Sequence, residues 1–143
     1  MKDPIETLKN LLKEKLPDPV ILHVRYSYLR TRIINPQTGT QITIYRRPSG
    51  IDLAGKYAFA LLEAIKETRD STGQATKIRE GKYRWQGHSG ETGEGEWEEW
   101  RYTLPKKEFL DKLIQKIREK YTRIPTESVH KLLGFFTGKI DSP

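Results

Sequence analysis

Residues with the chemistry of a metal-dependent nuclease lie close together in the second half of the chain. Glu80 and Lys82 form an E-x-K triplet, and five glutamates follow between Glu91 and Glu99. Side chains two apart on a strand point to the same side, so a carboxylate can hold a divalent metal while the lysine positions or activates water. This pattern indicates Glu80 and Lys82 as catalytic residues, with Glu80 and Glu98 as ligands of Mg²⁺ or Mn²⁺. Other sources of the second carboxylate are Asp52, Glu63 and Asp70.

A purely structural interpretation of the same residues competes with the metal site. The stretches 76–86 and 96–104 can pair as a second β-hairpin. If this hairpin closes around Glu91, Trp85 lies opposite Trp97 and Arg84 lies opposite Glu98, which gives an aromatic pair and an ion pair across the strands. E-x-K triplets also arise by chance in a chain of which 31% is charged. We therefore favour the structural interpretation and keep the nuclease as an alternative.

A basic segment without acidic residues lies nearer the N-terminus. Between Asp18 and Asp52 there is neither an acid nor a lysine, yet the segment carries five arginines of a chain whose net charge is +7. A guanidinium binds phosphate oxygens with two parallel hydrogen bonds and stacks on bases. The segment therefore favours nucleic acid, DNA or RNA, as the partner. Its arginines are Arg25, Arg30, Arg32, Arg46 and Arg47.

The basic segment has the pattern of a β-hairpin. Residues 20–34 and 41–47 are rich in β-branched and aromatic types, and the turn material of residues 35–40 separates them. Closure about Gln37 and Thr38 places Arg32 opposite Thr43 and Arg30 opposite Tyr45. Because side chains alternate along a strand, one face is then apolar and the other is basic and aromatic. The apolar face has Leu29, Thr31, Ile33, Ile42 and Ile44; the basic face has Tyr28, Arg30, Arg32, Tyr45 and Arg47.

These patterns predict three classes of function. The first is a sequence-tolerant nucleic-acid-binding protein, in which the arginines bind phosphates and Tyr28 and Tyr45 offer stacking surfaces. Arg46 and Arg47 would contribute at the turn before the next helix, whose N-terminus favours an anion. The second class is the metal-dependent nuclease, and the third is an interaction module for an acidic protein. An ordinary solvated sheet face would also explain the arginines.

The elements that must position these residues predict a single α+β domain over residues 1–143. We expect a four-stranded antiparallel sheet built from two β-hairpins, with helices packed on one face. Apolar residues at helical spacing predict four helices, and alternating or β-branched stretches predict the strands. The helices are expected at 3–16, 51–70, 105–121 and 126–137, and the strands at 20–34, 41–47, 76–86 and 96–104.

Composition excludes several classes of protein. The chain has no cysteine, which excludes disulfides, thiol nucleophiles and thiolate metal sites. It has no apolar run long enough to span a membrane and no apolar segment near the N-terminus, so we expect an intracellular, cytoplasmic protein. Thirteen glutamates against six aspartates, with two asparagines and one methionine, are typical of a thermophilic source.

The last predicted helix carries several large apolar side chains. Leu132, Leu133, Phe135 and Phe136 lie close together in it. We expect them to pack in the core, and a homodimer through this C-terminal helix is the alternative.

Overall fold

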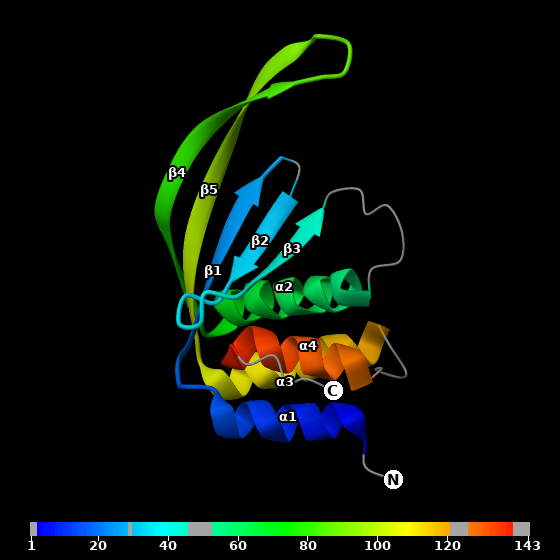
Figure 1. Cartoon of the computed structure of the whole chain (residues 1–143). Helices are drawn as coiled ribbons and strands as arrows, with labels where there is room; N and C mark the ends of the chain where they lie inside the picture. Colours follow the sequence, from blue (N-terminus) through cyan, green and yellow to red (C-terminus); the bar gives the residue numbers. More distant parts are fainter. Residues whose placement is uncertain (1–2, 29, 46–52, 121–125, 139–143) are drawn as a thin grey trace.

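The chain folds into one antiparallel sheet with four helices, described over residues 3–28, 30–45, 53–120 and 126–138 of a computed structural model (Figure 1). The sheet has the strand order β3-β2-β1-β5-β4, and every neighbouring pair is antiparallel. The predicted α+β class is therefore confirmed. In chain order the elements are α1 (Pro4–Lys15), β1 (Val20–Ser27), β2 (Arg30–Ile34), β3 (Gln41–Tyr45), α2 (Leu53–Ser71), β4 (Gln74–Gln86), β5 (Thr92–Leu104), α3 (Lys106–Lys120) and α4 (Thr126–Thr137).

The described sheet has five strands, so the prediction of four was wrong. The stretch 20–34, expected to be one strand, reverses after Ser27, and β1 pairs with β2 so that Val24 lies opposite Ile33. The hydroxyl of Ser27 donates to the carbonyl of Arg30 across this turn at 2.9 Å. Of the residues by which a turn is usually recognised in a sequence, the segment 27–30 contains only Ser27, which favours turns more weakly than glycine, proline, asparagine or aspartate.

The hairpin formed by β2 and β3 has the predicted register. Arg32 lies opposite Thr43, and Arg30 lies opposite Tyr45. Its loop is fastened to the end of α4, because the side-chain amide of Asn35 donates to the carbonyls of Phe135 and Phe136 at 3.2 Å. This contact fixes the hairpin relative to the helices.

The second hairpin, formed by β4 and β5, has a register different from the one predicted. Trp85 lies opposite Gly93 rather than Trp97, and Arg84 lies opposite Glu94 rather than Glu98. The hairpin closes around Ser89 instead of Glu91, and the backbone N–H of Gly87 donates to the carbonyl of Glu91 at 2.7 Å.

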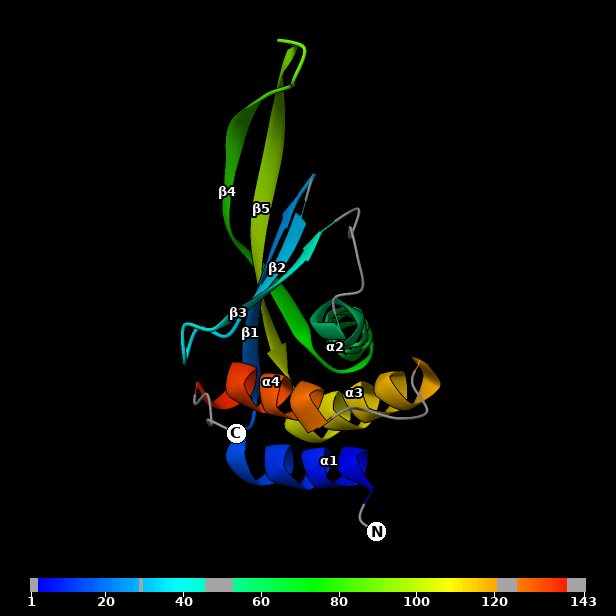
Figure 2. The same ribbon diagram turned by 45° about the vertical axis from the view of Figure 1, so that its right-hand side comes forward.

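Two properties of glycine explain the shorter loop. Gly90 adopts a φ of +85°, which permits a tight turn that most other residues would strain. Gly93 and Gly95, which lie between the expected strands 76–86 and 96–104, belong to β5 instead. They face the rings of Trp85 and Tyr83, and a side chain on either glycine would overlap those rings. The resulting two-stranded ribbon projects beyond the other strands (Figures 1 and 2).

The helices gather on one side and at one end of the sheet, opposite the tip of the ribbon (Figures 1 and 2). Helix α1 begins at Pro4, within the expected range 3–16, with Asp3 as its N-cap accepting from the N–H of Ile5 at 3.0 Å. The core joins apolar side chains of the sheet to those of all four helices. Among the described residues, no helix has both the length and the apolar character needed to cross a membrane.

The large apolar side chains of α4 lie inside this core. Leu132, Phe135 and Phe136 are buried within the single chain, and the ring of Phe136 meets Phe109 of α3 edge to face. Core packing of this helix is confirmed. The homodimer through this helix remains a prediction.

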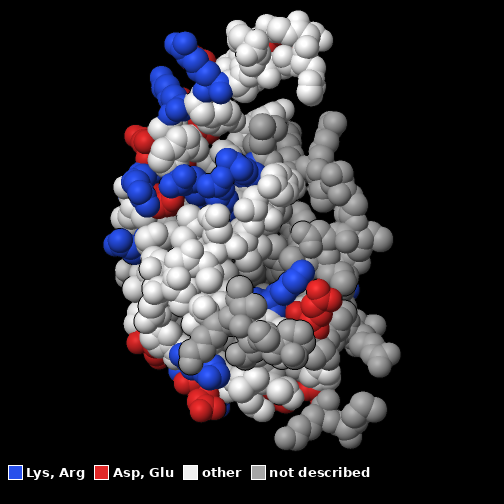
Figure 3. Space-filling view, in the orientation of Figure 1, with Lys and Arg blue, Asp and Glu red and all other residues white. Residues whose placement is uncertain are grey.

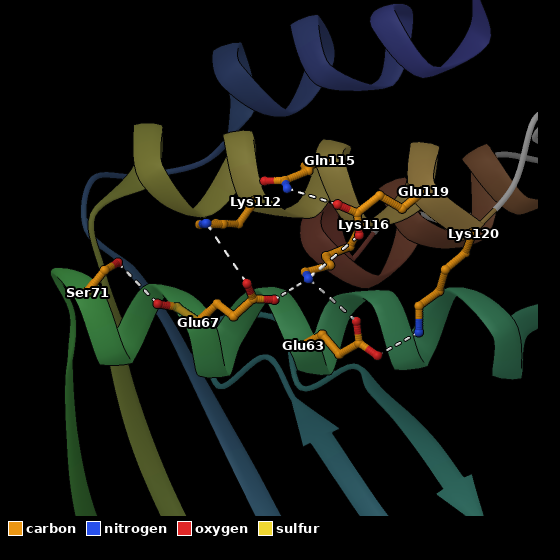
Figure 4. Close-up of polar contacts among 8 residues, drawn as sticks. All are labelled: Glu63, Glu67, Ser71, Lys112, Gln115, Lys116, Glu119 and Lys120. Carbon is orange, nitrogen blue, oxygen red and sulfur yellow. Dashed lines mark hydrogen bonds and ion pairs between the residues drawn. The ribbon is translucent and has the colours of Figure 1, made fainter.

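Ion pairs link α2 to α3 along their exposed edge (Figure 4). Lys116 contacts Glu67 at 2.5 Å and Glu63 at 4.0 Å, while Lys120 contacts Glu63 at 2.6 Å. Networks of this kind, rather than isolated pairs, are enriched in proteins that work at high temperature.

Candidate nucleic-acid interface

The sheet has one face packed on α2 and an opposite face, which we call the outer face. Val24, Ile33 and Tyr102 point into the core, so the alternating positions of each strand point outward. Across the middle of the outer face the registers align Thr43, Arg32, Arg25, Glu99 and Arg79 in one row. Basic side chains gather over the strands in the space-filling view (Figure 3).

Arginine dominates the charged side chains at the outward positions of the described strands. They hold five arginines and a single acidic residue, Glu99. The basic character predicted for the first hairpin therefore extends across the sheet, because β4 and β5 contribute two of these arginines. The five are Arg25, Arg30, Arg32, Arg79 and Arg101.

Two of the described outward arginines, Arg30 and Arg32, have guanidinium groups without a side-chain partner. In the described part of the chain neither side chain has an ion pair or a side-chain hydrogen bond, and Arg30 is exposed beside Tyr45, whose side chain is 56% exposed. The structure thus brings these three predicted residues together on one surface. Arg46 and Arg47 lie outside the described residues.

Arg25, by contrast, is already paired with an acid. Its Nε donates to Oε1 of Glu99 at 2.9 Å, and its guanidinium lies 4.6 Å from the ring centre of Trp97. Arg79 donates to Oε2 of Glu99 from Nε at 3.1 Å and from Nη2 at 2.7 Å. The two arginines and the one carboxylate therefore leave one net positive charge, and both guanidinium groups are held in place.

The carboxylate of Glu99 is fully buried, with 0% of the residue exposed. Burial by itself would raise its pKa, but the hydrogen bonds and charges of Arg79 and Arg25 outweigh burial and hold the pKa of Glu99 below its usual value. Glu99 consequently stays ionised and positions both arginines.

His23 borders this cluster. Its Nδ1 lies 3.9 Å from Oε2 of Glu99, and its Nε2 accepts from Nε of Arg101 at 3.3 Å. Burial lowers the pKa of His23, and the charges of Arg101 and Arg79 lower it further against the opposing effect of Glu99. The imidazole is therefore neutral at pH 7, in agreement with the acceptor role of Nε2.

Three aromatic side chains continue the outer face along the ribbon, and we call them the aromatic ladder. Trp97 lies over Gly81, Tyr83 over Gly95 and Trp85 over Gly93, each ring on the glycine directly across from it. A Cβ on any of these three glycines would run into the ring, so the rings lie against the ribbon. Trp85 remains 43% exposed.

A groove of about 1000 Å³ runs beside the ladder. It brings Tyr28, predicted as a stacking residue and 64% exposed, to the same space as Tyr83 and Trp85. The remaining lining residues are Lys82, Gln86, Glu94, Gly95 and Glu96.

The acidic residues of the ribbon occupy mainly its other side. Glu80 lies opposite Glu98, and Lys82 lies opposite Glu96, around a pocket of about 490 Å³. The carboxylates have partners: Glu80 accepts from Nζ of Lys77 at 3.1 Å, and Glu98 accepts from Nε1 of Trp100 at 2.9 Å. Among the described residues no three His, Cys, Asp or Glu side chains are grouped so as to hold a metal. A metal site at Glu80 and Glu98 remains a prediction.

Sequence reasoning missed the contribution of the second hairpin to the outer face. Arg79, Arg101 and Trp97 lie beside the predicted arginines only because β5 pairs with β1. The available signal was the recurrence of glycine at every second position, Gly93 and Gly95, in a hairpin whose other strand carries aromatic residues. No known protein-family model matches this chain, and no curated protein or solved structure shows detectable similarity to it.

Proposed function

We propose that the protein binds nucleic acid through the outer face of its sheet. The observation that carries this proposal is the segregation of charge: the outward strand positions hold five arginines, four aromatic rings and one acid. Four other glutamates of the ribbon lie on its opposite side. A phosphate backbone needs a positive surface, and exposed rings favour bases.

Each group on the outer face has a distinct role in this proposal. Arg30 and Arg32 bind phosphates, and Arg79 adds a third contact because 60% of its side chain is exposed despite its bond to Glu99. Tyr45 offers a stacking surface beside Arg30. Phosphate contacts carry little sequence information, so binding is expected to tolerate many sequences. Arg46 and Arg47 follow Tyr45 in the sequence and stay predicted phosphate contacts, although they lie outside the described residues.

The test is a binding titration with a charge-matched control. Arg30→Ala/Arg32→Ala removes two positive charges from the outer face, and Lys13→Ala/Lys15→Ala removes two from α1. In fluorescence anisotropy at about 50 mM salt, we expect the arginine variant to bind a labelled oligonucleotide at least about tenfold more weakly, and the lysine variant to match the wild type. Absence of wild-type binding at low salt would remove the proposal. Preference for an acidic polypeptide would favour the protein-interaction alternative.

A metal-dependent nuclease is the second candidate, favoured by the register that places Glu80 directly opposite Glu98 beside Lys82. The test incubates linear DNA, circular DNA and RNA with Mg²⁺ or Mn²⁺, with EDTA as the blank. Cleavage that disappears in Glu80→Ala and Lys82→Ala while binding persists would support the enzyme. Intact substrates with the wild type would eliminate it.

A further inference from the structure

We infer that the ligand of the outer face is a single strand, whose unpaired bases stack on the aromatic ladder while its phosphates meet the arginines. This inference rests on the function proposed above and assigns the ribbon to the binding site. It concerns the class of nucleic acid, which the arginines alone do not define, because phosphates are common to single strands and duplexes.

The ladder offers flat surfaces in the required orientation. Each ring packs one side against a glycine of the opposite strand. The Arg25 guanidinium lies over the ring of Trp97, so the surfaces offered for stacking are those of Tyr83 and Trp85. Trp97 stands at the base, next to Arg25, and Trp85 stands nearest the tip. The rings therefore continue from the arginine surface in a single line.

The spacing of the ladder distinguishes a single strand from a duplex. Successive rungs are two residues apart along a strand, which is about 6.8 Å. Bases in one strand of B-form DNA are only about 3.4 Å apart, and their flat faces are covered by their neighbours. One base on each ring therefore requires an unpaired, unstacked and extended strand.

The groove beside the ladder has the chemistry of a base site rather than a phosphate site. Tyr28, Tyr83 and Trp85 supply aromatic surface, and the charged lining residues, Glu94, Glu96 and Lys82, sum to one net negative charge, which disfavours a phosphate. A carboxylate can accept a hydrogen bond from an exocyclic base amine, as from N4 of cytosine. In this arrangement the arginines bind the phosphates of the strand, and the ribbon binds its bases.

A structural role for the rings must be separated from this binding role. An aromatic ring over a cross-strand glycine stabilises a hairpin without any ligand. Trp85→Leu and Tyr83→Leu keep an apolar side chain over the glycine but remove the planar stacking surface. Phe59→Leu on α2 is the matched control, because Phe59 is a 41% exposed aromatic residue that lies away from the outer face.

The experiment measures affinity for an oligodeoxythymidine strand and for a blunt duplex of equal length, after melting curves show that each variant folds. We expect the wild type to prefer the single strand, and Trp85→Leu and Tyr83→Leu each to weaken that binding by about 5- to 100-fold. Duplex binding and the Phe59→Leu variant should change less than about twofold. Quenching of wild-type tryptophan fluorescence by the oligonucleotide gives a second readout that needs no variant, and its absence would count against stacking.

The outcomes separate this inference from the proposed function. If Trp85→Leu and Tyr83→Leu bind the single strand as well as the wild type, or if the duplex is preferred, the inference is overturned. The nucleic-acid proposal would still stand in that case, provided that Arg30→Ala/Arg32→Ala weakens binding. No binding of either probe by the wild type would overturn both.

Discussion

Arg25 of β1 donates a hydrogen bond to the buried carboxylate of Glu99 of β5 at 2.9 Å, in the centre of the arginine-rich face. The carboxylate reduces the positive charge of this face, yet it also holds two guanidinium groups in a fixed geometry. Glu99 therefore has two opposite effects: it stabilises the fold, and it lowers the positive charge available to an anionic ligand.

Replacing Glu99 with alanine should separate these two effects. Loss of the carboxylate leaves Arg25 and Arg79 without their shared counter-charge, and breaking a fully buried pair costs about 3–5 kcal/mol. Both arginines are partly exposed, so we expect a smaller loss of about 2 kcal/mol in the free energy of unfolding. Affinity for nucleic acid, measured on the folded variant by anisotropy, should stay equal or rise. A tenfold loss of affinity in folded Glu99→Ala would show that the fixed geometry matters more than the charge.

His23 should make stability depend on pH in mildly acidic solution. Its pKa in the folded protein lies below the usual value near 6.5, so the unfolded chain takes up a proton more readily. The free energy of unfolding should therefore fall as the pH drops below about 6.5, and this part of the dependence should vanish in His23→Gln. Denaturant titrations at several pH values measure it, with His88→Gln in the exposed loop as the control. Parallel curves for the wild type and His23→Gln would contradict the neutral, partly buried imidazole.

The contact between Trp97 and Gly81 predicts energetic coupling within the ribbon. Gly81→Ala places a Cβ against the ring and should cost about 1–3 kcal/mol, as overpacking does elsewhere. In a Trp97→Leu background the same change should cost much less, because the ring is absent. A double-mutant cycle by thermal denaturation measures the difference. Additive costs would mean that the ring does not lie over Gly81.

Helices α2 and α3 should depend on Lys116 more than on an ordinary surface lysine. Lys116 contacts Glu67, Glu63 and Glu119, whereas the exposed Lys107 forms a single ion pair, with Asp111, among the described residues. We expect Lys116→Gln to lower the melting temperature more than Lys107→Gln, and added salt to narrow the gap. Equal melting temperatures at low salt would show that the network contributes nothing to stability.

The first hairpin could be predicted because its signals are local. Turn residues 35–40 mark its centre, and alternation then dictates that Arg30 and Arg32 share a face. The reversal after Ser27 could not be predicted, since β1 and β2 are specified by their pairing in the sheet and a single serine is a weak turn signal. As a result, one long strand was expected where two short ones form.

The second hairpin shows why the rest of the candidate site was missed. Cross-strand aromatic pairing suggested Trp85 opposite Trp97, but each ring lies over a glycine, which accommodates it without overlap. A bulge between Lys77 and Arg79 also shifts the alternation, so that the outward position of Arg79 does not follow from simple spacing. Pairing of β5 with β1, a long-range event, then adds Arg79 and Trp97 to the arginine face.

The salt dependence of binding tests the central claim most directly. For a single strand, the slope of the logarithm of the binding constant against the logarithm of salt concentration changes by about 0.7 for each phosphate contact. We predict that Arg30→Ala/Arg32→Ala makes the slope shallower than the wild type by about 1.4, while Lys13→Ala/Lys15→Ala leaves it unchanged. Identical slopes for the wild type and the arginine variant would contradict phosphate binding by the outer face.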